Sequence, residues 1–163
     1  MLFKNHLFLG VPKKNMSTPE TTEILIAKVP GCDVTIPTRA TEGSAGFDLY
    51  AMYDVDIKPG DKKKLFSGIQ IDLPPNFCAY IWGRSGLYMR NLEIFNGLLD
   101  SDFKDELIIV AKNTGKNLIS IKKGDRFAQL IITRCPSVVL KEINAIPSPS
   151  SASRFGGFGS TGQ

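Results

Sequence analysis

Residues 64–83 read KLFSGIQIDLPPNFCAYIWG, and this stretch indicates the class of the fold. Both halves are rich in β-branched and aromatic residues, and the pair Pro74-Pro75 separates them. Proline lacks a backbone N–H and is confined to the ends or edges of strands. We therefore expect one strand over residues 64–73 and a second over residues 77–82.

Similar short apolar runs, bounded by turn residues, continue from residue 23 to residue 142. Further strands are expected at 24–29, 47–51, 55–57, 107–111, 118–121, 127–133 and 138–140. Two turns, 113–116 and 122–125, have the composition of hairpin connections. Helical signal is confined to residues 86–90, where Ser85 can act as the N-cap. Many short strands at near-regular spacing indicate an all-β sandwich, jelly roll or barrel.

The two ends of the chain differ in composition from this β region. Residues 1–22 contain only lysines as charged residues before Glu20, and we expect a poorly ordered N-terminal arm. Residues 143–163 combine a Pro/Ser segment with a glycine-rich tail, which should be disordered or become ordered on another surface. The expected organisation is therefore an N-terminal arm (1–22), a β domain (23–142) and a C-terminal arm (143–163).

The composition argues against several kinds of active site. The only histidine is His6, in the N-terminal arm, which argues against a Ser-His-Asp triad, a Cys-His pair or a histidine-held zinc site. The three cysteines, Cys32, Cys78 and Cys135, contain no C-x-x-C pair. An enzyme built from this chain would therefore use a carboxylate as its base, or rely on a metal ion.

Charge and hydropathy limit the partners and the compartment. The formal net charge of +4 fits an anionic small-molecule substrate and is too small to require nucleic acid. No stretch approaches the roughly 20 apolar residues of a membrane span. The scattered cysteines favour a reducing compartment, and hence the cytoplasm or nucleus. A mitochondrial form is the less favoured alternative, because the basic N-terminal arm has no arginine.

Two segments could bind an anion or a metal ion. Gly83–Leu87 follows an expected strand and combines an arginine, a hydroxyl and a helix start, which suits a phosphate. The alternative is a capped turn with a surface arginine. Asp48 is the single acid among the apolar residues of Gly46–Tyr50. It either partners a metal ion or a basic group, or forms a turn at the end of a strand.

Two further segments could supply a base or a buried polar group. Asp100 and Asp102 lie two residues apart in Asn96–Phe103, so on an extended segment both side chains would face the same side. Asp-Ser-Asp is otherwise typical of a turn. Gln129 lies among apolar residues in Gly124–Leu130. It needs hydrogen-bond partners if it is buried, or faces outward if the strand lies at a sheet edge.

Taken in order with the glycine-rich tail, these segments resemble the five motifs of the trimeric dUTPases (deoxyuridine triphosphate nucleotidohydrolases). The matching segments are Thr41–Ala51, Gly83–Leu87, Gly97–Phe103, Gly124–Leu130 and Gly156–Gly162. The resemblance covers nearly the whole chain after the N-terminal arm. It implies an all-β subunit with a distorted jelly-roll (β-clip) fold, and a homotrimer with three shared active sites.

The resemblance implies hydrolysis of dUTP to dUMP and pyrophosphate, which keeps uracil out of DNA and supplies dUMP for thymidylate synthesis. Asp100 would activate the water that attacks the α-phosphorus. Mg²⁺ is the implied cofactor, bound mainly by the triphosphate and reached by Asp48 through water. In this family three subunits contribute to each site. One supplies motifs one, two and four at the phosphates, another the pyrimidine pocket of motif three, and the third a closing C-terminal arm.

The same resemblance implies substrate contacts for further residues. Main chain near Asn96 and Gly97 would read the uracil edge, and Phe103 would lie beneath the deoxyribose. Phe158 in the tail would stack on the base. The implied substrate-binding set is Arg84, Ser85, Gly86, Asn96, Gly97, Phe103, Gln129, Arg154, Phe158, Gly159, Ser160 and Thr161.

The chain departs from the family pattern at several positions. Phe103 stands where the family has tyrosine, Lys104-Asp105 where it has Arg-Gly, and Gly83 where proline is usual. Arg154 lies one residue nearer the Gly-Gly-Phe of the tail than is usual. Two alternatives stay open, the first because of the departures at Lys104-Asp105 and Arg154, and the second because Glu106 lies near the third motif. The chain could be a catalytically weak or inactive dUTPase-fold protein that binds or signals, or a dCTP deaminase with Glu106 as its base.

Overall fold

The computed structural model describes residues 21–145, which contain eleven strands and one helical turn. The elements are β1 (Leu25–Lys28), β2 (Phe47–Tyr50), β3 (Val55–Ile57), β4 (Lys62–Phe66), β5 (Ile69–Asp72), β6 (Phe77–Gly83), α1 (Ser85–Tyr88), β7 (Leu92–Ile94), β8 (Gly97–Leu99), β9 (Ile108–Asn113), β10 (Ile119–Ile121) and β11 (Arg126–Arg134). The all-β class expected from the sequence is confirmed.

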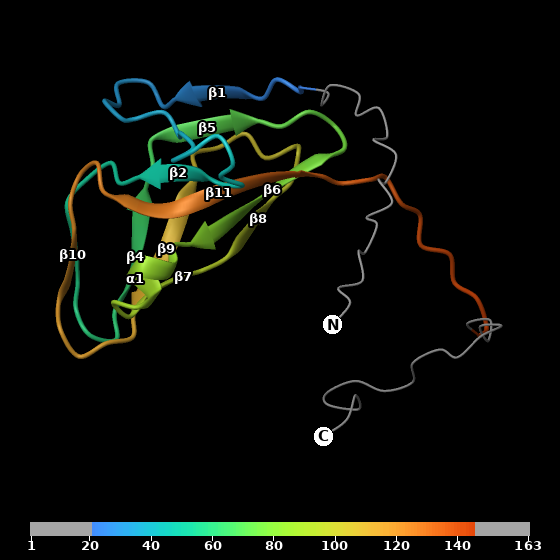
Figure 1. Ribbon diagram of the computed structural model, residues 1–163. Coiled ribbons are helices and arrows are strands. Elements are labelled where there is room, and N and C mark those ends of the chain that lie inside the picture. The colour runs from blue at the N-terminus through green and yellow to red at the C-terminus, as the bar shows by residue number, and fades with distance from the viewer. Residues whose placement is uncertain (1–20, 146–163) are drawn as a thin grey trace, which may run out of the picture.

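The strands form small antiparallel sheets wrapped around one core, in the manner of a distorted jelly roll (Figure 1). One sheet has the order β2-β11-β6-β8 and a second has the order β4-β9-β7. Two further strand pairs, β1-β5 and β10-β3, form two-stranded sheets. Every pair is antiparallel. Some paired strands are far apart in sequence, as β2 and β11 are.

Alternation along β6 decides which side chains enter the core. Ala79 and Ile81 are buried, whereas Tyr80 and Trp82 are 40% and 51% exposed. Successive side chains of a strand point to opposite faces, so the β2-β11-β6-β8 sheet has one face on the core and one face uncovered within the described chain. Phe127, at the start of β11, is the largest fully buried side chain on the core side.

The expected single strand over residues 64–73 is wrong, because the chain turns at Ser67-Gly68 and forms β4 and β5 instead. Gly68 has φ +67°, and a Cβ there would lie 2.8 Å from Cγ1 of Val34. Only glycine fits this backbone without strain. The Ser67 hydroxyl donates a 2.8 Å hydrogen bond to the Leu107 carbonyl, which fixes the turn against the chain just before β9.

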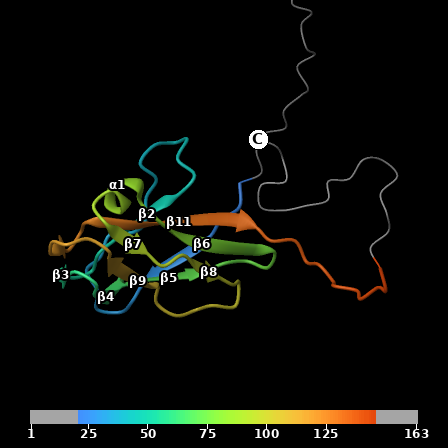
Figure 2. The ribbon, with the colours of Figure 1, turned by 90° about the horizontal axis from the view of Figure 1, so that it is seen from below.

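Other expectations also failed for physical reasons. Residues 138–140 form no strand, and the chain from residue 135 to residue 145 runs away from the body as an extended segment in Figure 1 and Figure 2. The turn over residues 113–116 does not close a hairpin, because β10 pairs with β3 rather than with β9. Apolar runs predict strands but not their partners, and the short strands β7 and β8 were not predicted at all.

The helical turn begins one residue earlier than predicted, and its N-cap is Arg84, which makes no side-chain capping bond. Ser85 is therefore the first helical residue rather than the cap. The expected arms at residues 1–22 and 143–163 fall almost entirely outside the described residues. Among residues 21–145, no helix has the length and apolar character needed to cross a membrane.

Asn113 gives a test of this fold, because it is a fully buried polar side chain at the end of β9. Its amide donates to the carbonyls of Ile57 (2.8 Å) and Asn117 (2.7 Å), and its oxygen accepts from Gly115 N–H (2.9 Å). Asn113→Ala should lower the free energy of unfolding by about 2–4 kcal/mol, because these backbone groups lose their partner in a buried site.

Urea unfolding at a fixed protein concentration measures this loss. Asn117→Ala is the matched control, because residue 117 contributes only its carbonyl to the network and its side chain is exposed. The control should change stability by no more than about 0.5 kcal/mol. Equal stability of both variants would show that the Asn113 network does not stabilise the fold.

Candidate active site

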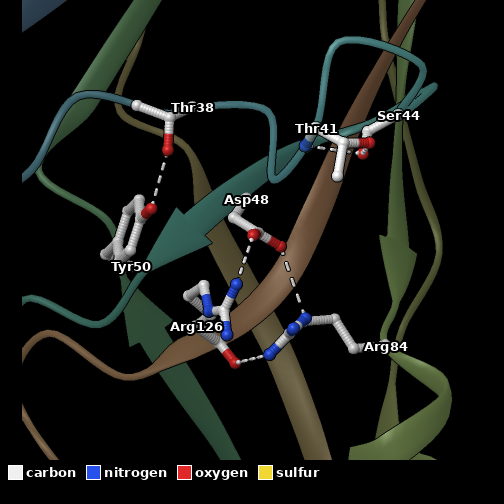
Figure 3. Close-up of polar contacts among 7 residues, drawn as sticks. All are labelled: Thr38, Thr41, Ser44, Asp48, Tyr50, Arg84 and Arg126. Atoms are coloured by element: carbon white, nitrogen blue, oxygen red, sulfur yellow. Dashed lines mark hydrogen bonds and ion pairs between the residues drawn. The ribbon is translucent and has the colours of Figure 1, made fainter.

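The buried carboxylate of Asp48 lies between two arginine side chains (Figure 3). Nε of Arg84 is 3.3 Å from Oδ1, and Nη1 of Arg126 is 3.1 Å from Oδ2. Nη1 of Arg84 also donates a 3.0 Å hydrogen bond to the Arg126 carbonyl. Of the alternatives for Asp48, the structure favours a partner of basic groups over a turn residue. The cluster contains one carboxylate and two guanidinium groups.

Strand pairing brings this cluster together. Asp48 on β2 stands opposite Gln129 on β11, and Gln129 stands opposite Trp82 on β6. Gly46 is buried beside this row, and a Cβ there would lie 3.2 Å from Cβ of Gln129. Glycine at position 46 therefore leaves room for Gln129, which is half-buried beside the charged cluster.

A hollow of about 490 Å³ opens next to this cluster, at the turn between β6 and β7. Its lining includes Arg84 and Ser85 from the predicted anion site, Asn96, and the exposed Trp82 and Tyr88. The guanidinium of Arg84 donates one N–H to the Arg126 carbonyl and forms an ion pair with Asp48 through Nε, so further N–H groups are left for a ligand. The hollow can therefore take an anionic molecule with a flat or apolar part.

Asp100 lies on a different part of the molecule. It follows β8, it is exposed, and the Phe103 N–H donates to its carbonyl at 3.2 Å to close a turn. Asp-Ser-Asp is therefore a turn, and the extended geometry that would place Asp100 and Asp102 on one side is not formed. Phe103 and Gly97 line a second hollow of about 310 Å³, whose walls are otherwise aliphatic and aromatic.

The loop after Asp100 is anchored through Lys104. Its ammonium donates a 2.7 Å hydrogen bond to the Ser101 carbonyl and forms an ion pair with Asp72 at the end of β5. The amide of Gln70 donates to the Lys104 carbonyl at 3.2 Å. Because these contacts hold the turn at both ends, the position of Asp100 depends on a residue outside the family pattern.

The structure brings some predicted residues together and leaves others apart. The β6–β8 register pairs Ala79 with Leu99, so Asp100 falls opposite Cys78, while the Asp48–Gln129 row meets β6 at Trp82. Residues 78 and 82 of one strand are separated by roughly 13 Å at about 3.3 Å per residue. Within one chain, Asp100 is therefore remote from the arginine cluster.

Comparison with known proteins identifies the family. The dUTPase family model matches residues 33–162. The deoxyuridine 5'-triphosphate nucleotidohydrolase of vaccinia virus (strain Copenhagen) is 36% identical over 126 residues, which are 77% of this chain and 84% of that protein. The protein of the same name from Thermoanaerobacter sp. (strain X514) is 39% identical over 137 residues, covering 80% and 90%. The chain belongs to the dUTPase family.

Solved dUTPase structures have the same fold. The dUTPase of Staphylococcus bacteriophage 80alpha, in a variant with dUpNHpp, superimposes with a TM-score of 0.79 at 23% identity, over 87% of this chain and 99% of that one. A dUTPase variant from phage phi11 of S. aureus has a TM-score of 0.72 at 19% identity, over 76% and 98%, and that structure describes a structural Mg(II) ion. At these identities the likeness concerns the jelly-roll fold alone.

The geometry gives the deaminase alternative no support. Oε1 of Glu106 accepts a 2.8 Å hydrogen bond from the Gly68 N–H, which attaches this carboxylate to the β4–β5 turn. Motif five of a dUTPase, including Arg154, Phe158, Gly159, Ser160 and Thr161, lies outside the described residues. The roles expected for those residues stay predictions.

Arg126 and Trp82 were missed by sequence reasoning. Arg126 lies in the fourth segment, but no local pattern shows that its side chain reaches Asp48, which is 78 residues away in the sequence. A signal was available, because a lone acid in an apolar strand requires a positive partner. Trp82 is the single tryptophan of the chain, and it gives this dUTPase an optical probe beside Arg84.

Removal of the charge of Asp48 tests the cluster. Asp48→Asn should lower the free energy of unfolding by about 2 kcal/mol, because two guanidinium groups lose a charge-assisted partner in a largely buried place. Asp54→Asn is the matched control. Asp54 also accepts two hydrogen bonds, from Lys122 Nζ at 3.0 Å and from the backbone N–H of Lys123 at 2.8 Å, but its side chain is 61% exposed.

The control should change stability little, since surface ion pairs contribute little. Urea unfolding gives the free energies, and Trp82 fluorescence reports whether the hollow changes. A loss in Asp48→Asn no larger than in Asp54→Asn would contradict the central role of this carboxylate.

Proposed function

We propose that this chain hydrolyses dUTP to dUMP and pyrophosphate as a homotrimer, in sites shared between subunits. Asp100 of one subunit accepts a proton from the water that attacks the α-phosphorus. Arg84, Ser85, Gly86 and Gln129 of another subunit bind the phosphates. The observation that carries the proposal is the separation of Asp100 from the arginine cluster within one chain.

The uncovered face of the β2-β11-β6-β8 sheet supports subunit association. Tyr80, Trp82 and Leu98 on this face are 40%, 51% and 58% exposed, and they lie between the arginine cluster and Asp100. An apolar surface of this kind is typical of an interface. A second subunit placed here can bring its own Asp100 to the arginine cluster of the first, which neither subunit achieves alone.

The extended segment after β11 supports exchange of C-terminal arms. Val138, Val139 and Leu140 are 74%, 91% and 95% exposed, so they have no apolar cover in the described chain. Residues 146–163, which include motif five, follow this segment directly. The segment leads away from its own subunit (Figure 2), which is the geometry needed to deliver the tail to a neighbour.

The residues present fit Mg²⁺ only through water. Oδ1 of Asp48 is buried and lacks a hydrogen-bond donor in the described chain, so it can accept a bond from a metal-bound water. Residues 21–145 contain no cluster of three His, Cys, Asp or Glu side chains that could bind the ion directly. The triphosphate would supply the inner ligands, and the bound ion would neutralise charge on the phosphates.

The second hollow fits a pyrimidine deoxynucleoside. Gly97 and Phe103 line it, so main chain near Asn96 and Gly97 would read the uracil edge and the ring of Phe103 would form an apolar floor beneath the sugar. A buried donor or acceptor left unpaired by cytosine would discriminate against it. Phe158 of the tail would cover the base, while Arg154, Gly159, Ser160 and Thr161 would close over the phosphates and exclude water. We place this reaction in the cytoplasm or nucleus.

Asp100→Asn tests the base. The variant should bind dUTP with unchanged affinity, measured by Trp82 fluorescence, and should release pyrophosphate about 10²–10⁴-fold more slowly, because the amide cannot accept the proton of the water. Turnover equal to that of the parent would disprove the assignment. Parallel assays with UTP and dCTP, with ammonia measured, separate a dUTPase from a deaminase or an inactive binding protein.

Subunit mixing tests whether the sites are shared. Asp100→Asn and Arg84→Ala should each be inactive alone, but mixed trimers contain sites that combine an intact Asp100 with an intact Arg84. Unfolding and refolding an equal mixture should restore about one quarter of parental activity, from random assembly. If each site lay within a single chain, the mixture would stay inactive.

A further inference from the structure

Two of the three cysteines lie side by side at the end of the β6–β11 ladder. Cys78 pairs with Thr133, and the Cys135 N–H donates a 2.6 Å hydrogen bond to the Asn76 carbonyl one step beyond the strand pairs. Alternation along both strands places Cys135 on the same face of the sheet as Cys78, as its diagonal neighbour. The Cys135 thiol also raises the pKa of the Cys78 thiol, as expected for neighbouring side chains.

The two thiols differ in access. Cys78 is buried and only 5% exposed, whereas Cys135 is exposed as the first residue after β11. The Cys135 N–H is held by the Asn76 carbonyl and the chain leaves the sheet just beyond it, so closure of a disulfide requires a backbone shift at the start of this segment. Cys32 is the third cysteine, and it packs near Val34 and Gly68 on another part of the molecule.

We propose that Cys78 and Cys135 are a site of reversible oxidation, at which a low-molecular-weight disulfide such as glutathione disulfide closes an intrachain bond. This bond fixes the point from which the C-terminal segment leaves the sheet. The effect on catalysis rests on the proposed function, because it assumes that the segment carries motif five to a neighbouring subunit.

The reaction proceeds in two exchange steps. The thiolate of Cys135 attacks one sulfur of glutathione disulfide, so that a mixed disulfide forms and one glutathione thiolate leaves. The thiolate of Cys78 then attacks Sγ of Cys135 and releases the second glutathione. The two protein thiols lose two electrons and two protons, and one glutathione disulfide gains them to become two glutathione thiols.

The surroundings of Cys78 make the second step dependent on pH. Burial raises the pKa of the Cys78 thiol above its ordinary value of 9.0, and negative charge at Cys135 and Asp100 raises it further. The hydroxyl of Tyr80 on the same strand has a smaller opposite effect through a hydrogen bond. Few Cys78 thiols are ionised at neutral pH, so ring closure should accelerate as the pH rises.

The test uses the full-length protein and glutathione disulfide, with free thiols counted and peptides mapped by mass spectrometry. The expected result is loss of two of the three thiols, a peptide that links residues 78 and 135, and a free Cys32. Below the pKa of Cys78, the rate of release of the second glutathione should rise about tenfold per pH unit.

Matched variants identify each step. Cys78→Ser should stop at one glutathione on Cys135, Cys135→Ser should not react in the folded protein, and Cys32→Ser should react as the parent does. A parent protein that stops at the mixed disulfide, or that links two chains through Cys135, would overturn the proposal.

A separate activity measurement tests the effect on the arm. The oxidised enzyme should show a KM for dUTP raised about fivefold, with kcat changed less than about twofold, because a restrained arm contributes less to binding. Dithiothreitol should reverse the change, and Cys78→Ser should not show it. Disulfide formation with unchanged KM would refute the effect on the arm. Absence of dUTP hydrolysis in the reduced parent would refute the proposed function and leave the thiol result intact.

Discussion

The fold around the site depends on one buried negative charge. Asp48 pairs with a guanidinium group from the adjacent strand β11 and with another from the turn after β6, so it connects its edge strand β2 to β11 and to the end of β6. A carboxylate in this position costs desolvation energy unless it is paired. The same pairing orients Arg84 toward the hollow at α1. One interaction therefore stabilises the sheet and prepares the place where phosphates are proposed to bind.

The uncovered sheet face is consistent with the proposed sharing of sites between subunits. Tyr80, Trp82 and Leu98 are exposed together on this face, and their burial in the proposed interface would contribute about 25 cal/mol per Å² of apolar area. The row is bounded by the arginine cluster and by Asp100, so an interface here would also bring functional groups together. Association and catalysis would then be coupled. Asp100 would not have to reach the arginine cluster of its own subunit.

Sequence reasoning recovered the class of the fold and most strands, because alternation and turn residues are local signals. It failed where distant residues decide the outcome. The break at Gly68 depends on contact with Val34, and the partner of Asp48 is Arg126, 78 residues along the chain. Motif order indicated the family correctly, and the family model confirms it. The separation of Asp100 from Arg84 follows only from strand register, which no short pattern contains.

The Lys104-Asp105 pair shows how the chain accommodates its departure from the family. Lys104 donates to the Ser101 carbonyl and pairs with Asp72, while Oδ1 of Asp105 accepts from the Glu106 N–H at 2.7 Å. The Lys104–Asp72 pair is about half exposed, so it contributes little free energy. Its effect is geometric, because it links the turn that carries Asp100 to the end of β5. Lys104 departs from the family pattern in sequence. In the structure it nevertheless anchors the loop that carries Asp100, through its ion pair with Asp72.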